Sequence, residues 1–301
     1  MFAQDRNRVI TVIGLGALLL LGVAGWLFAA EAATTSTITF DFTHVAGRKA
    51  LDGTWVTRYD QALVTQADAK FSADAIEDTS RGNEHNFTCT GNPKFSDPEN
   101  TITATKVIGH STPRSAEFIG NVVADSIPKV DTTGKGLRGN PTHITSNTLT
   151  YDYARKWGEF ATNVVMVITP HTPAKPVDSS DVNGQLGSAP STITCDTLSY
   201  DAHTRKALAK SNVVVKQKDR TLWADQGIYE EDSELVMLSG NVRIKNEGEG
   251  EVKSFENADK VTVSTAGTDE WIDAVAKPGE RIKMVLVVPD KQPTTTPAPP
   301  K

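Results

Sequence analysis

The stretch Leu222-Trp-Ala-Asp225-Gln-Gly-Ile-Tyr229, followed by Gly240-Asn241-Val242, decides the fold because the chain repeats it. An upstream copy reads Ile193-Thr-Cys-Asp196-Thr-Leu-Ser-Tyr200 and leads to Ser211-Asn212-Val213. In both copies the acidic residue precedes the asparagine by 16 positions. A fixed spacing of this kind indicates a repeated supersecondary unit.

Further copies extend the repeat toward both ends of the chain. Two of them keep the spacing of 16 with a different polar residue in the acidic position, one is looser, and one is degraded. They are Asn147 to Asn163, Thr105 to Asn121, the looser Ala67-Asp68 to Gly91-Asn92, and a final unit that begins with Phe255-Glu-Asn-Ala-Asp259.

Each unit is predicted to be two antiparallel strands joined by a polar turn. Val236, Leu238, Gly240, Val242 and Ile244 fall on one face of a strand, and the residues between them fall on the other. A period of two with one apolar face is typical of an antiparallel strand that covers a core. The 36 threonines and 27 valines among 301 residues also favour strands. The fold class is therefore predicted to be all-β.

The small residue beside each asparagine, as in Gly240-Asn241, indicates a bulge or bend in mid-strand. Bends that recur in successive units allow a sheet to curl. We expect the asparagine to bridge neighbouring backbone there, which is a structural role.

Residues 9–30 contain no charge, and the preceding residues include Arg6 and Arg8. As a helix the segment would be about 33 Å long, enough to cross a bilayer core of about 30 Å. The alternative is a cleaved signal peptide ending near Ala30-Glu-Ala32, but signal cores are shorter than this segment. We predict a cytoplasmic head (1–8) and a transmembrane anchor (9–30), with the remainder outside the cytoplasm by the positive-inside rule.

The exported part is predicted to be one β domain (31–288). Two polar, Gly- or Pro-rich stretches, 125–141 and 170–190, interrupt the repeat and are expected to be inserted loops. The Pro-rich end, 289–301, is expected to be a disordered tail.

The sequence gives few indications of catalysis or of cofactor binding. A net charge of −6 without a Lys/Arg cluster argues against nucleic acid as a partner. Gly134-Lys-Gly-Leu-Arg-Gly139 matches a dinucleotide motif, but Asn140-Pro141 follows where the motif needs a helix. The six histidines are expected in turns and without a catalytic partner. We predict no catalytic residue, no metal site and no cofactor.

Cys89 and Cys195 are expected on strands of different units. In an oxidising compartment they could form a disulfide, whereas as free thiols they would behave as small apolar side chains.

The repeated Ala/Cys-Asp-x-Leu/Ile-x-Tyr and Gly-Asn-Val signatures resemble the OstA-like family of lipopolysaccharide-transport proteins, which comprises LptA, LptC and the N-terminal domain of LptD. The resemblance covers residues 55–275 and is strongest over 193–242. Trp55-Val-Thr-Arg-Tyr59-Asp60 is similar to the opening strands of LptC, which also carries one N-terminal transmembrane helix. The membrane-anchored LptC branch is therefore the closest, although the two inserted loops depart from its pattern.

The resemblance implies an open, twisted β jelly roll whose apolar face holds the acyl chains of lipopolysaccharide or a related lipid. It implies no enzymatic activity, an inner-membrane location with the bulk of the chain in the periplasm, and two partners. These are an inner-membrane ABC transporter (LptB/LptF/LptG-like) and an LptA-like bridge that joins by strand addition. The residues expected to line the lipid groove are Val213, Val215, Leu222, Ile228, Val236, Leu238, Val242 and Ile244.

Three alternatives stay open at this point. The chain is a secreted LptA-like bridge, a structural β-repeat protein of the envelope that binds no lipid, or an envelope enzyme that acts on glycans or lipids. Lipid that co-purifies with the chain would distinguish the lipid-transport hypotheses from the structural hypothesis.

Overall fold

The computed structural model describes residues 38–66, 68–81, 84–98, 100–127, 140–152, 154–169, 190–201, 203–217, 220–230, 233, 235–246, 252–264 and 272–286. The expected head, anchor and tail (1–8, 9–30 and 289–301) lie outside these residues, as does the motif 134–139. The part that the structure describes contains no helix of a length and apolar character that could span a bilayer.

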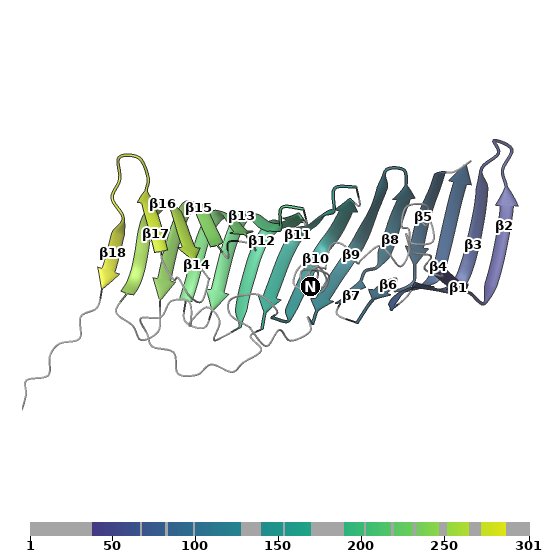
Figure 1. Cartoon of the computed structure of the whole chain (residues 1–301), viewed down its shortest axis with the longest axis horizontal. Helices are drawn as coiled ribbons and strands as arrows, with labels where there is room; N and C mark the ends of the chain where they lie inside the picture. Colours follow the sequence, from purple (N-terminus) through teal and green to yellow (C-terminus); the bar gives the residue numbers. More distant parts are fainter. Residues whose placement is uncertain are drawn as a thin grey trace, which may run out of the picture.

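The described residues form a single antiparallel sheet of 18 strands, which confirms the all-β prediction (Figure 1). The strands are β1 (Ile38–Asp41), β2 (His44–Lys49), β3 (Trp55–Gln66), β4 (Ala69–Arg81), β5 (Glu84–Thr90), β6 (Lys94–Ser96), β7 (Asn100–Thr103), β8 (Lys106–Ser111), β9 (Arg114–Ser126), β10 (Thr142–Asp152), β11 (Trp157–Ile168), β12 (Ser191–Asp201), β13 (Lys206–Gln217), β14 (Arg220–Glu230), β15 (Leu235–Asn246), β16 (Val252–Ser264), β17 (Ile272–Ala276) and β18 (Lys283–Leu286).

From β9 to β16 each strand pairs with the one before and after it, so the chain meanders along the sheet. Some positions in the sheet are filled by two short strands end to end. Strand β4 pairs with both β5 and β6, and β9 pairs with both β7 and β8. At the two ends, β1 and β2 both pair with β3, and β17 and β18 both pair with β16.

The predicted mid-strand bends are present and occur in every second position of the sheet. Each consists of two successive residues with positive φ, and the ladder register shifts beside them. The five pairs are Gly91-Asn92, Gly120-Asn121, Thr162-Asn163, Ser211-Asn212 and Gly240-Asn241. An extra residue in one strand bends that strand and increases its twist.

The spacing of 16 places a polar side chain of one strand against the bend of the next. Asn212 Nδ2 donates to Asp196 Oδ2 at 2.9 Å, and Asn241 Nδ2 donates to Asp225 Oδ2 at 2.7 Å. In the Thr105 copy the threonine hydroxyl donates instead to the carbonyl oxygen of Gly120, at 3.0 Å. The repeated residues therefore have a structural role at the bends, but these two asparagines bond to an aspartate side chain and not to neighbouring backbone as expected.

The looser copy of the repeat uses a different acidic residue from the one expected. Asp68 lies in the turn between β3 and β4, away from the bend at Gly91. Asp74 on β4 takes the position instead, since its backbone N–H donates to the carbonyl oxygen of Gly91 at 3.1 Å. The extended β4–β5 hairpin displaces the acid along the sequence.

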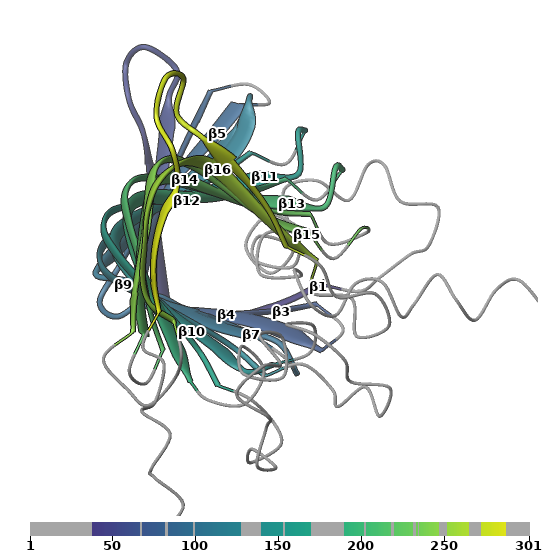
Figure 2. The same ribbon diagram turned by 90° about the vertical axis from the view of Figure 1, so that its left-hand side faces the viewer.

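The aligned bends fold the sheet into two walls, so that the end-on view shows an open C (Figure 2). Side chains at directly paired positions point to the same face of a sheet. Three rows of such positions cross the sheet on the face that forms the core, and a fourth lies beside the bends.

We name the rows by one member each. The Phe71 row is Phe40, Val64, Phe71, Phe95, Ile102, Ala124, Ile144, Met166, Ile193, Val215, Leu222, Ile244, Phe255 and Met284. The Phe118 row is Tyr59, Ile76, Cys89, Val107, Phe118, Leu149, Phe160, Leu198, Ala209, Gly227, Leu238, Val261 and Ala274.

The Tyr151 row is Asp78, Phe87, Gly109, Ala116, Tyr151, Gly158, Tyr200, Ala207, Tyr229, Val236 and Val263. The bend row consists of buried residues next to the bends, namely Val122, Val164, Cys195, Val213, Ala224, Val242 and Ala258.

Most of the two expected loops, 128–139 and 170–189, lies outside the described residues. The first expected loop begins later than the sequence indicates, because Asp125 is part of β9 and pairs with His143 and Thr101. Both cysteines are free and buried, Cys89 in the Phe118 row and Cys195 in the bend row.

Replacing Gly240 with alanine is expected to destabilise the sheet by about 3 kcal/mol, from backbone strain and overpacking together. Its φ is +71°, and an added β-carbon would stand 2.7 Å from Asp225 Cβ. Gly279→Ala is the matched control, because its φ of +79° would strain an alanine equally but no atom lies within 4 Å of the added β-carbon. Urea denaturation should give a loss of about 1 kcal/mol for the control. Equal losses for the two variants would contradict the packing role of Gly240.

Candidate functional site

The core-facing rows differ in exposure along the sheet, and this difference defines the candidate site. From β4 to β10 the members of the three named rows are buried. From β11 to β15 the Phe71 row is half-buried throughout, at Met166, Ile193, Val215, Leu222 and Ile244. We call β4–β10 the sealed half and β11–β16 the open half.

The Tyr151 row repeats the pattern on the other wall. Tyr200, Ala207, Tyr229, Val236 and Val263 are half-buried, whereas Phe87, Ala116 and Tyr151 are buried. Between these two rows, the bend row and most of the Phe118 row are buried along the whole sheet. The open half therefore presents two partly exposed apolar rows, one on each wall, that flank a closed strip of small side chains.

Seven of the eight residues predicted to line a lipid groove lie in the core-facing rows. Val215, Leu222 and Ile244 belong to the Phe71 row and Val236 to the Tyr151 row, and all four are half-buried. The other three are buried, which makes them part of the closed core: Val213 and Val242 in the bend row, and Leu238 in the Phe118 row.

The eighth predicted residue, Ile228, lies on the opposite face. It pairs with Leu208 on one side and with Met237 on the other, and both point away from the core. The cause is the register shift between Trp223 and Gln226, which moves the phase of β14 by one residue. A shift of one residue exchanges the two faces of a strand.

Because of the same phase shift, alternation read along a whole strand misses several core-facing residues. Tyr229 and Gly227, beyond the shift in β14, face the core, as do Tyr200 and Leu198 beyond the shift in β12. Met166 of β11 is also in the Phe71 row. Reading each strand as two alternating segments separated by the Asp position would have found them.

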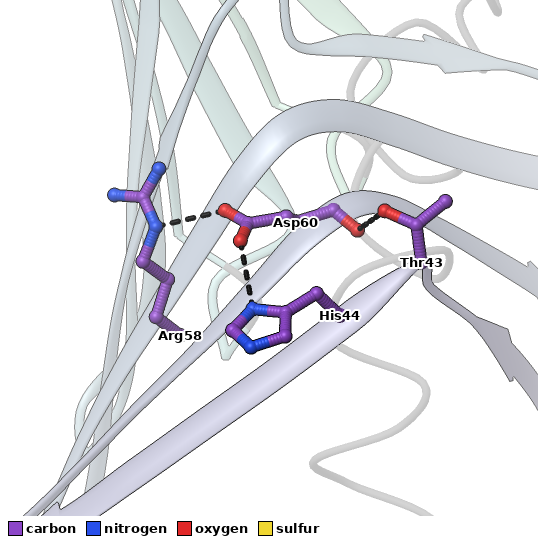
Figure 3. Close-up of polar contacts among 4 residues, drawn as sticks. All are labelled: Thr43, His44, Arg58 and Asp60. Carbon is purple, nitrogen blue, oxygen red and sulfur yellow. Dashed lines mark hydrogen bonds and ion pairs between the residues drawn. The ribbon is translucent and has the colours of Figure 1, made fainter.

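The sequence predicts the histidines in turns, but only one of those that the structure describes lies in a turn. His44, His85, His110 and His143 lie on strands, and His203 lies in a turn. Figure 3 shows one of the strand sites, where His44 Nδ1 and Arg58 Nε meet the Asp60 carboxylate at 3.1 and 2.8 Å. The hydrogen bond from His44 lowers the pKa of Asp60 most, and the hydrogen bond from Arg58 lowers it further.

A second pair, His85 and Asp78, is less exposed. His85 Nδ1 lies 3.0 Å from Asp78 Oδ2, and its ring stacks on Phe87. Asp78 is a buried member of the Tyr151 row, and burial raises its pKa although the hydrogen bond from His85 opposes the shift. These pairs are cross-strand contacts at the end of the sheet opposite the open half.

The two thiols are unreactive in this arrangement. Burial raises the pKa of Cys89 to about 12 and, together with the nearby Asp196, that of Cys195 to about 11. The thiolate is the reactive form of cysteine, and these values keep both residues protonated at neutral pH. The described residues contain no group of His, Cys, Asp and Glu side chains that could hold a metal ion.

No family model and no curated protein matches the chain. Among solved structures it is similar to the crystal structure of LptH, the LptA homologous periplasmic component of the conserved lipopolysaccharide transport device from Pseudomonas aeruginosa. The sequence identity is 14% and the TM-score 0.33, over 60% of this chain and 95% of LptH.

Replacing Asp78 with asparagine is expected to stabilise the fold at pH 7. A raised native pKa means that the folded state binds the proton more tightly, so stability falls as pH rises from 3.8 through the raised value. The advantage of Asp78→Asn should therefore shrink as the pH is lowered toward 3.8. Thermal unfolding of the two proteins between pH 3.5 and 7 measures the difference.

Asp60→Asn is the control, and its effect on stability at pH 7 should have the opposite sign. The lowered pKa of Asp60 stabilises the fold above 3.8, and that contribution is lost as the pH falls. This variant should be less stable than the parent at pH 7 and should approach it in acid. A pH-independent effect of Asp78→Asn would contradict the assignment of a buried, protonatable carboxyl.

Proposed function

We propose that the chain is a non-enzymatic lipid-binding and transfer protein of lipopolysaccharide export, which holds acyl chains on the core-facing rows of its sheet. The observation that carries the proposal is the pair of apolar rows in the open half, which face the interior of the C and yet stay partly exposed. A core that serves stability alone would bury them. The choice of lipopolysaccharide is supported by the OstA-like sequence signatures at 193–242.

The energy available from such rows fits a lipid with long acyl chains. Burial of one CH₂ group contributes about 0.8 kcal/mol, so a 12-carbon chain gains roughly 10 kcal/mol. Many apolar side chains share this energy, and no single residue is required to recognise the ligand. The net charge of −6 makes a bulk basic surface an unsuitable holder for an anionic lipid.

The two ends of the sheet support the proposed partners. Large apolar side chains are exposed at the first edge, at Phe42, Val45 and Trp55, and at the last edge, at Val275, Met284 and Val285. Natural proteins protect exposed edge strands or use them to pair with another chain. In the proposed pathway, one edge docks to the inner-membrane transporter and the other adds a strand of an LptA-like bridge.

In this proposal residues 9–30 anchor the chain in the inner membrane, and the sheet lies in the periplasm. A structural β-repeat protein without lipid is the second candidate, favoured by the same exposed edges, since strand pairing alone would account for them. The two functions differ in whether the open half binds lipid.

Leu222→Asp should abolish lipid co-purification, because it places a charge in a half-buried core-facing row. Ile228→Asp is the matched control on the same strand, equally half-buried but on the opposite face, and should retain lipid. Mass spectrometry of lipid extracted from the purified full chain measures both. Lipid absent from the parent protein, or lost equally in both variants, would favour the structural candidate.

Met284→Glu should weaken assembly with a purified LptA-like bridge by tenfold or more, since it puts a charge into the apolar row at the last edge. Ile127→Glu is the control, because Ile127 is 66% exposed but lies outside the edge strands. Biolayer interferometry with the immobilised bridge gives both dissociation constants. Equal binding by the two variants would argue against this edge as the docking site.

A further inference from the structure

We propose that the acyl chains bind only within the open half, β11–β16, and that the sealed half, β4–β10, is a permanently filled core that lipid does not enter. The inference rests on the proposed lipid-binding function and narrows its site. A continuous apolar face would by itself suggest that lipid occupies the whole length of the sheet and passes along it from edge to edge. With the sealed half closed, lipid would instead enter and leave the open half through the open side of the C (Figure 2).

Aromatic rings fill the sealed half. Phe71 and Phe95 are 0% exposed, Phe118 and Tyr151 are 1% exposed, and Phe87 is 4% exposed. They come from both walls, because Phe71 and Phe95 belong to the Phe71 row while Phe87 and Tyr151 belong to the Tyr151 row. Protein interiors are packed as densely as organic crystals, so rings that are already fully buried leave no room for an acyl chain.

Between the buried rings of Phe160 on β11 and Phe255 on β16, the open half has smaller side chains in two rows. The Phe71 row has Ile193 and Val215 there, and the Phe118 row has Ala209 and Gly227. Gly227 is in close contact, since an added β-carbon would lie 3.4 Å from Leu238 Cδ2. The floor between the walls is therefore packed, while the Phe71 row above it stays half-buried from β11 to β15.

The change from sealed to open occurs between two neighbouring strands. Ile144 of β10 is 5% exposed, whereas its direct partner Met166 of β11 is half-buried. On the other wall, Tyr151 of β10 and its partner Gly158 of β11 are buried, and Tyr200 of β12, next in the same row, is half-buried. The two walls thus open within one strand of each other.

Each half-buried row is long enough for an acyl chain. The Phe71 row is half-buried over the five strands β11–β15 and the Tyr151 row over β12–β16, and five strands at a spacing of about 4.8 Å span roughly 19 Å. An acyl chain occupies about 15 Å, half of the 30 Å hydrocarbon core of a bilayer. One such chain laid across the strands fits along either row without reaching β10.

Matched photo-crosslinking at three tyrosines of one row tests the proposal. Tyr151, Tyr200 and Tyr229 are each replaced by 4-azidophenylalanine, which exchanges the hydroxyl for an azide and keeps the ring. The probe is lipopolysaccharide with a radiolabelled acyl chain, added to the full chain in detergent. We expect labelling at positions 200 and 229 to exceed that at position 151 by tenfold or more.

The outcomes separate the two proposals. Equal labelling at all three positions would overturn confinement and leave the lipid-binding function standing. No labelling at any position, together with no co-purifying lipid, would overturn both. Hydrogen–deuterium exchange of the unsubstituted chain is the independent readout if the variant at 151 folds poorly. Lipid should then slow exchange in β12–β15 and leave β5–β9 unchanged, and slowing in both regions would again overturn confinement.

Discussion

The structure depends on one local interaction, the contact between a left-handed residue pair in one strand and a polar side chain of the strand before it. Left-handed φ values cost an ordinary side chain about 1–3 kcal/mol unless the surroundings hold them in place. Here the holding groups are specific, as in the hydrogen bond from Asn241 to Asp225 and its continuation from Lys277 Nζ to Asn241 Oδ1 at 2.6 Å. Because these contacts line up across the sheet, the bends add and the sheet folds into two walls.

Much of this could be predicted from the sequence, because few residue types besides Gly and Asn adopt the left-handed conformation of the bend easily. An Asn that follows Gly, Ser or Thr, with a polar residue 16 positions before it, is visible without coordinates in four copies, and these copies locate the hairpins. The same bend explains the errors. Strict alternation puts Ile228 on the wrong face because β14 shifts its phase by one residue at Asp225, and the repeat points to Asp68 where Asp74 takes the position because the β4–β5 hairpin is longer than the others.

Other features depend on pairing that no single strand reveals. His44 and Asp60 are 16 residues apart and become partners only through the register of β2 and β3. The distinction between the sealed and open halves is similar, since the sequence shows where the phenylalanines lie but not that the rings on both walls are buried. Burial of the Phe71 and Tyr151 rows is a property of the folded sheet, and a single strand does not reveal it.

The alternation of bent and phase-shifted strands also restricts how the length of this sheet can change. From β9 to β15 each strand with the extra residue lies between strands without it. Gain or loss of one strand would place two bent or two unbent strands side by side, whereas gain or loss of a complete hairpin keeps the alternation. The sheet is thus built in steps of two strands, and it can lengthen or shorten by whole hairpins without a change at either end.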